Sequence, residues 1–146
     1  MSTVGRGEVV PRRAPKKGTA ITYGTFDLFH IGHLNLFRRI KDMFDVLIVA
    51  VSTDEFNSSK GKRAWVPFSD RLEIVRSCRF VDLAIPEPCW NQKERDIATY
   101  GVDAFVMGND WVGHFDHLRA LCDVIYLPRT DGISTTMLKQ QVAEAK

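Results

Sequence analysis

The sequence lacks the features of several protein classes. It holds three cysteines, an odd number with no C-x-x-C pair, which argues against a disulfide framework or a thiolate metal site and favours a reducing cytoplasm. No apolar run approaches the roughly 20 residues of a membrane span. Neither GxxxxGK[ST] nor GxGxxG occurs. These absences exclude a membrane protein, a P-loop protein and the usual dinucleotide fingerprint.

The first nineteen residues differ in composition from the rest. They carry five Lys or Arg against one acid, with two prolines and three glycines, and they lack the apolar core of a signal peptide. We expect residues 1–19 to form a disordered basic tail and residues 20–146 to form one domain. Of the chain's 20 basic and 18 acidic residues, 15 and 17 remain in that domain. The domain is therefore nearly neutral, and most of the chain's excess positive charge lies in the tail. We interpret the tail as a solvated extension rather than a nucleic-acid arm, and we expect neither a nucleic-acid nor a membrane partner.

Strand-like and helical segments alternate along the chain, which is typical of βαβ units and a mostly parallel sheet. Five segments read as strands: 20–23, 45–52, 82–85, 104–107 and 123–127. The expected fold is α/β, a Rossmann-like doubly wound domain with a five-stranded, mainly parallel sheet and helices on both faces. Such sheets bind ligands at the carboxyl ends of their strands, near the point where strand order reverses.

Helix ends can be placed from single residues. Ser69 and Ser134 are expected N-caps, and Gly101 is the expected residue after the helix 91–100. A further helix is expected over 114–122, before the fifth strand.

The segment from residue 53 to residue 67 interrupts this alternation. It is long for a connection in a compact domain and carries three closely spaced cations, Lys60, Lys62 and Arg63. Long loops are often functional lids, and ammonium groups on long stems can close over an anionic ligand. From the residues alone, a solvated run of charge is the more ordinary interpretation.

GTFDLFHIGH, residues 24–33, places His30 and His33 at a strand-to-helix turn. The unpaired N–H groups and the dipole of a helix start attract phosphate. Gly32 removes a Cβ there, so we expect the backbone to approach a phosphate closely while both imidazoles reach polyphosphate oxygens. Core packing or a zinc pair are alternatives, although zinc needs further ligands and the two remaining histidines lie in another helix. Donors at this place suit the α-phosphate of nucleotidyl transfer.

A second anion-binding helix start is expected in PRTDGISTT, residues 128–136. Arg129 can grip phosphate as a planar fork, Gly132 permits a tight turn, and residues 134–136 bring hydroxyls and N–H groups. Alone, a capped helix would explain this segment equally well. Two such helix starts in one small domain favour a polyphosphate ligand.

Together, GTFDxxHxGH and RTDGISTT resemble the cytidylyltransferase family, within the HxGH nucleotidyltransferase superfamily. The segments STDEFN, KGKRA, RFVD, IPEPCWNQKERDI and FVMGNDW are similar in order and spacing to the branch that acts on glycerol 3-phosphate, from about Ala20 to the end of the chain. The resemblance implies that CTP and sn-glycerol 3-phosphate give CDP-glycerol and pyrophosphate, by in-line attack on the α-phosphate. It also implies a cytoplasmic homodimer whose product feeds teichoic-acid or capsule polymers.

The resemblance implies roles for individual residues as well. Those implied to bind CTP are Thr25, Phe26, His30, Ile31, Gly32, His33, Lys62, Asp110, Arg129, Thr130, Asp131, Gly132, Ile133, Ser134, Thr135 and Thr136. Those implied to be catalytic are His30, His33, Lys60, Lys62 and Arg129. Lys60 and Lys93 are implied to bind the acceptor, and Asp27 to bind a metal or organise the site, with Mg²⁺ shielding the triphosphate.

One residue departs from the family pattern, which usually has two acids after Gly108. This chain has Asn109 and then Asp110, whose carboxylate could accept from the exocyclic amine of cytosine.

Three alternatives stay open: a cytidylyltransferase for phosphoethanolamine or phosphocholine, an adenylyltransferase of the same superfamily, and a non-catalytic nucleotide-binding domain. The acceptor pocket separates the first, because a quaternary ammonium is typically held by an aromatic cage whereas glycerol needs hydroxyl-directed hydrogen bonds. RTDGISTT weighs against the second, and the two intact histidines weigh against the third.

Overall fold

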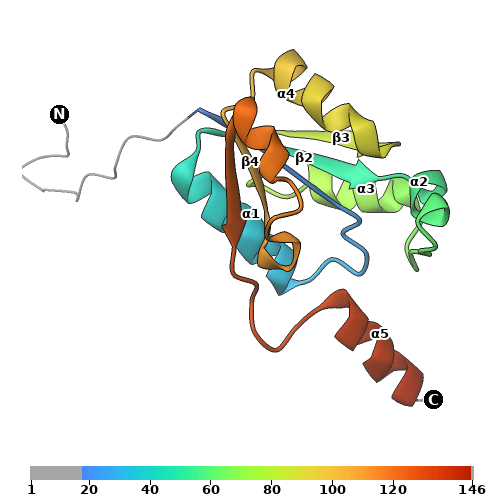
Figure 1. Cartoon of the computed structure of the whole chain (residues 1–146). Coiled ribbons are helices and arrows are strands. Elements are labelled where there is room, and N and C mark those ends of the chain that lie inside the picture. Colours follow the sequence, from blue (N-terminus) through green and yellow to red (C-terminus); the bar gives the residue numbers. More distant parts are fainter. Residues whose placement is uncertain (1–17, 146) are drawn as a thin grey trace, which may run out of the picture.

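The computed structural model describes residues 18–145 (Figure 1). Within this range five parallel strands form one sheet in the order β3-β2-β1-β4-β5. The strands are β1 (Thr19–Gly24), β2 (Val46–Ser52), β3 (Leu83–Glu87), β4 (Ala104–Gly108) and β5 (Asp123–Leu127). The order reverses between β1 and β4, so the sheet is doubly wound and the predicted fold class is confirmed.

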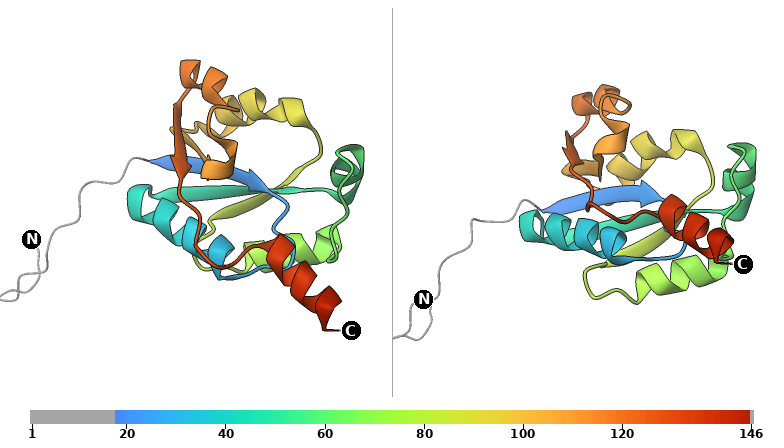
Figure 2. Two further views of the ribbon diagram at one scale, coloured as in Figure 1. Left: turned by 60° about the horizontal axis from the view of Figure 1, so that its bottom comes forward. Right: turned by 90° about the horizontal axis from the view of Figure 1, so that it is seen from below.

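Helices cover both faces of the sheet, as Figure 2 shows. They are α1 (Ile31–Met43), α2 (Asp54–Ser59), α3 (Phe68–Arg76), α4 (Lys93–Tyr100) and α5 (Thr135–Glu144), with 3₁₀ turns η1 (Trp90–Gln92), η2 (Asn109–Trp111) and η3 (Asp116–Ala120). None of the helices within residues 18–145 is both long enough and apolar enough to cross a membrane.

The alternation of side chains along each strand produces two cores. Leu47 and Val49 of β2 face α1 and α3, where they pack with Phe37. Ile48, between them, faces the opposite side and packs with Ile97 of α4. Strands that bury both faces need an apolar residue at nearly every position, which is why these segments stand out in the sequence.

Several predicted helix ends are confirmed. Ser134 caps α5, since its Oγ accepts from the N–H of Met137 at 3.1 Å. Gly101 ends α4 in the left-handed conformation, with φ of 61°. The helix expected over 114–122 is instead the short 3₁₀ turn η3.

The prediction for Ser69 was wrong. Pro67 occupies the N-cap position of α3, and Ser69 is the second residue of the helix. The backbone N–H of Phe68, the first residue of α3, instead donates a hydrogen bond to Asp54 Oδ2 at 3.0 Å. Asp54 opens α2, which occupies part of the segment expected to be a loop; Thr53 Oγ1 caps that helix.

Two terminal regions complete the description. Most of the predicted tail lies outside the described residues, and Thr19 is already the first residue of β1. At the other end, α5 follows a long connection from β5 and none of its residues is buried (Figure 1).

Candidate active site

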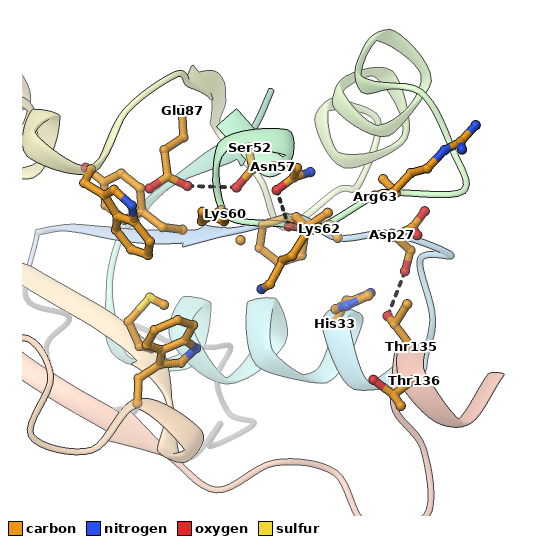
Figure 3. Close-up of a pocket in the computed structure, with 18 of the residues that line it drawn as sticks. Asp27, His33, Ser52, Asn57, Lys60, Lys62, Arg63, Glu87, Thr135 and Thr136 are labelled. Atoms are coloured by element: carbon orange, nitrogen blue, oxygen red, sulfur yellow. Dashed lines mark hydrogen bonds between the residues drawn. The ribbon is translucent and has the colours of Figure 1, made fainter. Parts of the chain in front are cut away.

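A cavity of about 450 Å³ opens at the carboxyl ends of the strands, where strand order reverses (Figure 3). The residues at or just beyond the strand ends form its floor: Tyr23 of β1, Thr25 just after it, Ser52 of β2, Glu87 of β3 and Met107 of β4. Residues of α1, α2, α4 and α5, of the 3₁₀ turns η1 and η2, and of the segment after α2 supply most of the remaining walls. This is the location expected for a ligand site in a doubly wound sheet.

His30 and His33 form a capping box at the start of α1. The Nδ1 of His30 accepts from the N–H of Gly32 at 3.0 Å, and the Nδ1 of His33 accepts from the N–H of His30 at 3.2 Å. The two rings stack with their centres 3.9 Å apart. Because both Nδ1 atoms accept, the hydrogen-bond network places each ring proton on Nε2. Each imidazole therefore has one N–H donor left for a ligand.

Both histidines are neutral near pH 7. Burial, followed by the neighbouring His30, lowers the pKa of His33 to about 3, although Asp27 opposes this. Burial also lowers the pKa of His30. The site thus presents two neutral hydrogen-bond donors rather than two imidazolium ions.

Gly32 has a structural role that the sequence did not indicate. A Cβ on this residue would lie 2.7 Å from Cε1 and 2.9 Å from Nδ1 of His30. The glycine therefore makes room for the capping imidazole. A Cβ at this position would also lie 3.6 Å from Cγ2 of Ile133, so the two motifs that flank the predicted phosphate site are neighbours in space.

Asp27 joins three segments of the site. Its buried carboxylate accepts from the N–H groups of Trp65 and Val66 at 2.8 and 3.0 Å and pairs with Lys139 of α5 at 2.8 Å. Its carbonyl oxygen accepts from Thr135 Oγ1 at 2.8 Å (Figure 3). Burial alone would raise the pKa of Asp27, but the hydrogen bonds from Lys139 and from the two backbone N–H groups lower it.

These contacts favour an organising role for Asp27. Both carboxylate oxygens already accept hydrogen bonds, and one of them also faces an ammonium group. Among residues 18–145, no group of three or more His, Cys, Asp or Glu side chains is arranged to hold a metal.

Arg71 is a buried side chain that links the backbone segments around the cavity. It is 1% exposed and donates to the carbonyl oxygens of Val66, Thr25 and Ser52, each at 2.8 Å. Its second terminal nitrogen pairs with Asp54 at 2.7 Å. One guanidinium thus connects the turn after β1, the end of β2 and the segment that carries Lys60 and Lys62.

A buried ion pair occupies the β3 side of the cavity. Glu87 and Lys93 are 3% and 5% exposed, and Lys93 Nζ lies 2.9 Å from Glu87 Oε2. Ser52 Oγ donates to the other carboxylate oxygen at 3.0 Å. The pKa of Lys60 is lowered by burial and by the neighbouring Lys62 and Lys93, against the opposing effect of Glu87.

Asn57 of α2 leaves one polar group unpaired. Its Oδ1 accepts from Thr25 Oγ1 at 3.1 Å. Its Nδ2 is buried without a hydrogen-bond partner among the residues that the structure describes, and the residue lines the cavity. An unpaired buried donor costs free energy, so this amide is suited to a ligand acceptor.

Comparison with known proteins identifies the family. The cytidylyltransferase-like family model matches residues 21–141. The chain belongs to the cytidylyltransferase-like family of nucleotidyltransferases. It is 55% identical to the glycerol-3-phosphate cytidylyltransferase of Staphylococcus aureus (strain NCTC 8325 / PS 47), over 84% of this chain and 92% of that protein. It is 53% identical to the enzyme of the same name from Bacillus subtilis (strain 168), over 84% of this chain and 95% of that protein.

More distant cytidylyltransferases and structures extend the comparison. The ethanolamine-phosphate cytidylyltransferase of Arabidopsis thaliana is 32% identical over 66% of this chain and 24% of that protein. The crystal structure of a lipopolysaccharide core biosynthesis protein from Thermoplasma volcanium GSS1 superposes with a TM-score of 0.67 at 21% identity, covering 77% of this chain and 98% of that one. That structure supports the fold alone.

The cytidylyltransferase cavity brings together only part of the predicted set. The predicted residues that line it are Thr25, Phe26, Asp27, His33, Lys60, Lys62, Lys93, Thr135 and Thr136. The predicted residues outside its lining are His30, Ile31, Gly32, Asp110, Arg129, Thr130, Asp131, Gly132, Ile133 and Ser134. Arg129 instead pairs with Asp110 at 3.0 Å, and Thr130 Oγ1 accepts from Asn35 at 3.1 Å.

Other lining residues of this cytidylyltransferase were missed. They are Tyr23, Gly24, Ser52, Asn57, Ala64, Glu87, Trp90, Met107, Trp111, Phe115 and Lys139; Arg63, noted only as part of a run of charge, lines the cavity as well. Ser52 and Glu87 end β2 and β3, so their place at the carboxyl edge of a parallel sheet was a usable signal. Lys139 carried no such signal, because only the fold brings α5 to Asp27.

Proposed function

We propose that this cytidylyltransferase transfers the cytidylyl group of CTP to sn-glycerol 3-phosphate, which gives CDP-glycerol and pyrophosphate. The observation that carries the proposal is the identity of 52–55% to three glycerol-3-phosphate cytidylyltransferases, of whose length this chain covers 92–95%. Three ethanolamine-phosphate cytidylyltransferases, one of them named as probable, match at 29–35% identity over 24–37% of their own length.

The cavity has two ends that suit two polyanions. His33, Thr135 and Thr136 lie at the helix starts of α1 and α5, where N–H groups and helix dipoles attract the triphosphate. Lys60 and Lys93 lie on the β3 side and suit the phosphate of the acceptor. Lys62 lies between these two groups (Figure 3), where charge builds up during transfer.

The reaction needs positioning more than proton transfer. An oxygen of the acceptor phosphate attacks the α-phosphorus of CTP, a new P–O bond forms, and the bond to the bridging oxygen breaks as pyrophosphate leaves. The attacking oxygen is already anionic, so no general base is required. The enzyme must align the reactants and stabilise the negative charge of the transition state.

The histidines suit the second task. Their Nδ1 atoms are held by backbone N–H groups, so the Nε2–H donors are fixed in direction before CTP binds. Donors held in advance need no reorganisation as charge develops on the α-phosphate oxygens. Arg129 would add a planar fork for the outer phosphates once it exchanges Asp110 for the nucleotide.

Mg²⁺ is proposed to enter with CTP, held by phosphate oxygens and water. The donor set around Asp27 does not fit a protein-held metal, because its oxygens are engaged by two N–H groups and Lys139. No step is therefore assigned to a metal held by Asp27. Bound to the triphosphate, the ion would neutralise part of its charge.

Three further parts of the proposal come from the resemblance. The chain is proposed to act as a homodimer, in the cytoplasm, and to supply CDP-glycerol for teichoic-acid or capsule polymers. Light scattering of the purified chain tests the dimer, and a mass of one chain across the micromolar range would contradict it.

Pyrophosphate release tests the reaction directly. CTP, ATP, GTP and UTP are each combined with sn-glycerol 3-phosphate, phosphocholine or phosphoethanolamine. Turnover is expected with CTP and sn-glycerol 3-phosphate. Turnover with ATP would instead indicate an adenylyltransferase, and a preference for phosphocholine or phosphoethanolamine would indicate another acceptor. CTP binding without turnover on any acceptor would indicate a non-catalytic domain.

A further inference from the structure

Aromatic rings surround the buried ammonium group of Lys93. The Nζ atom lies 4.7, 5.2 and 5.5 Å from the ring centres of Tyr23, Trp90 and Phe115. Lys60 lies against the same group of rings, with its Nζ 4.1 Å from the centre of Phe56 and 5.1 Å from that of Trp90. Tyr23, Phe56, Trp90 and Phe115 are called the aromatic box below.

Such a box is the arrangement that recognises quaternary ammonium ligands. Here the positions over the rings are already taken by two ammonium groups of the chain itself. An acceptor that carried choline or ethanolamine would bring a third cation beside Lys60 and Lys93. The ammonium group of such an acceptor would be repelled by these two lysines, whereas a choline-binding protein offers it free aromatic faces.

The remaining polar groups at this end suit hydroxyls. A carboxylate has about four acceptor positions, and Glu87 uses two of them for Ser52 and Lys93. The unpaired Nδ2 of Asn57 adds a donor to the same cavity. A glycerol group, whose hydroxyls both donate and accept, can satisfy such groups, whereas a trimethylammonium group cannot.

We propose that the Glu87–Lys93 ion pair fills the aromatic box and thereby determines acceptor specificity, favouring a neutral polyol phosphate and excluding ammonium-bearing phosphoalcohols. This inference rests on the proposed function. It assigns Glu87 a part in specificity and gives Lys93 an excluding role toward cationic acceptors, in addition to any contact with phosphate.

The first test changes Lys93→Met, which keeps an unbranched side chain but removes the charge. The ratio of kcat/KM for phosphocholine to kcat/KM for sn-glycerol 3-phosphate is expected to rise by about 100-fold, because a desolvated aromatic box gains a cation and Glu87 gains a counter-ion. Lys41→Met is the matched control. Lys41 also pairs with a carboxylate at 2.9 Å, that of Asp82, but it lies outside the cavity lining, so the ratio should stay unchanged.

A binding measurement keeps the proposal testable if Lys93→Met is poorly active. Choline alone should raise the Tm of Lys93→Met and change its tryptophan fluorescence, while wild type and Lys41→Met show neither effect. If Lys93→Met does not fold because Glu87 is left unpaired, the double variant Glu87→Gln, Lys93→Met removes both charges. That variant should discriminate less against phosphocholine than wild type does, and choline alone should raise its Tm but not that of wild type.

The outcomes separate this inference from the proposed function. Wild-type turnover of CTP with sn-glycerol 3-phosphate, together with an unchanged acceptor ratio and no choline binding in the variants, would overturn the inference alone. Wild type that prefers phosphocholine would overturn both. A raised ratio in Lys93→Met, with Lys41→Met like wild type, supports the inference.

Discussion

Two ion pairs, one inside the cavity and one beside it, differ in how firmly their charges are held before substrates bind. On the β3 side, Glu87 and Lys93 are almost fully buried and already paired with each other. On the side of the β5–α5 connection, Asp110 and Arg129 also form a pair, but their side chains are 63% and 52% exposed. A buried pair resists rearrangement, whereas an exposed pair is worth little and exchanges readily.

This difference indicates a division of labour. The acceptor end is organised in advance, so its residues should govern which acceptor reacts. Under the proposed function the nucleotide end would rearrange around CTP, so most of its residues should govern nucleotide affinity. His30 and His33 are the exception at the nucleotide end, because backbone N–H groups fix both rings. Four changes test this comparison.

The largest effect is expected for His30→Asn, which removes the fixed donor at the nucleotide end. Asparagine can still cap α1, so the fold should lose less than about 1 kcal/mol. Loss of one preorganised donor should lower kcat by about 100- to 1,000-fold, with a much smaller change in CTP affinity. Steady-state kinetics and CTP titration measure both. His117→Asn, at an exposed histidine in η3 rather than at the start of α1, should match wild type, and equal losses in kcat and affinity would exclude a transition-state role.

Arg71→Met tests whether the buried guanidinium of Arg71 keeps the acceptor end rigid. Three carbonyl oxygens and Asp54 would lose their buried donor, so the free energy of unfolding should fall by about 3 kcal/mol. Urea denaturation measures the change. Arg76→Met removes an exposed arginine from the same helix and should cost less than about 1 kcal/mol. Similar losses in the two variants would show that Arg71 does not hold the site together.

Arg129→Lys tests the adaptable end. Lysine keeps the charge but lacks the planar fork, so KM for CTP should rise about tenfold while KM for sn-glycerol 3-phosphate stays constant. Arg119→Lys changes an exposed arginine paired with Asp116 and should leave both constants unaltered. A change in acceptor KM alone would reverse the assignment of the two ends.

The smallest effect concerns the acid stability of the fixed histidines. The pKa of His33 is lowered to about 3, below its unfolded value near 6.5. The unfolded chain therefore binds a proton that the folded chain does not, and stability falls as pH drops from about 7 to 5. In His33→Gln, which keeps a capping-box side chain, this decline should shrink by about 1 kcal/mol, allowing for partial exposure. Urea titrations at both pH values test it, and an unchanged decline would mean that His33 is not buried as a neutral ring.

Local patterns in the sequence predicted the fold well. The strands β1, β2 and β4 were recognisable because they bury both faces, and Ser134 and Gly101 were recognisable because their roles depend only on neighbours in sequence. Ser69 was misassigned because Asp54 supplies the hydrogen bond from another helix. Such a contact exists only after the chain has folded.

In the candidate site, too, residues whose contacts come from distant parts of the chain were hard to predict. His33, Lys60 and Lys62 were identified and do line the cavity. Lys93 looked like a surface helical residue from the pattern alone, because its partner Glu87 comes from the end of a strand and its aromatic neighbours come from several elements. Arg71 gave only a weak signal, its position one helical turn before the buried Val75.

The contacts of Asp27 have a practical consequence for handling the protein. One carboxylate secures both the lysine-bearing segment, through the backbone at residues 65 and 66, and the last helix, through Lys139. A bulky fusion partner packed against α5 would disturb that helix and, through Asp27, the segment that carries Lys60 and Lys62. Tags are better placed ahead of β1, and a compound wedged between Asp27 and Lys139 would disturb both of these segments at once.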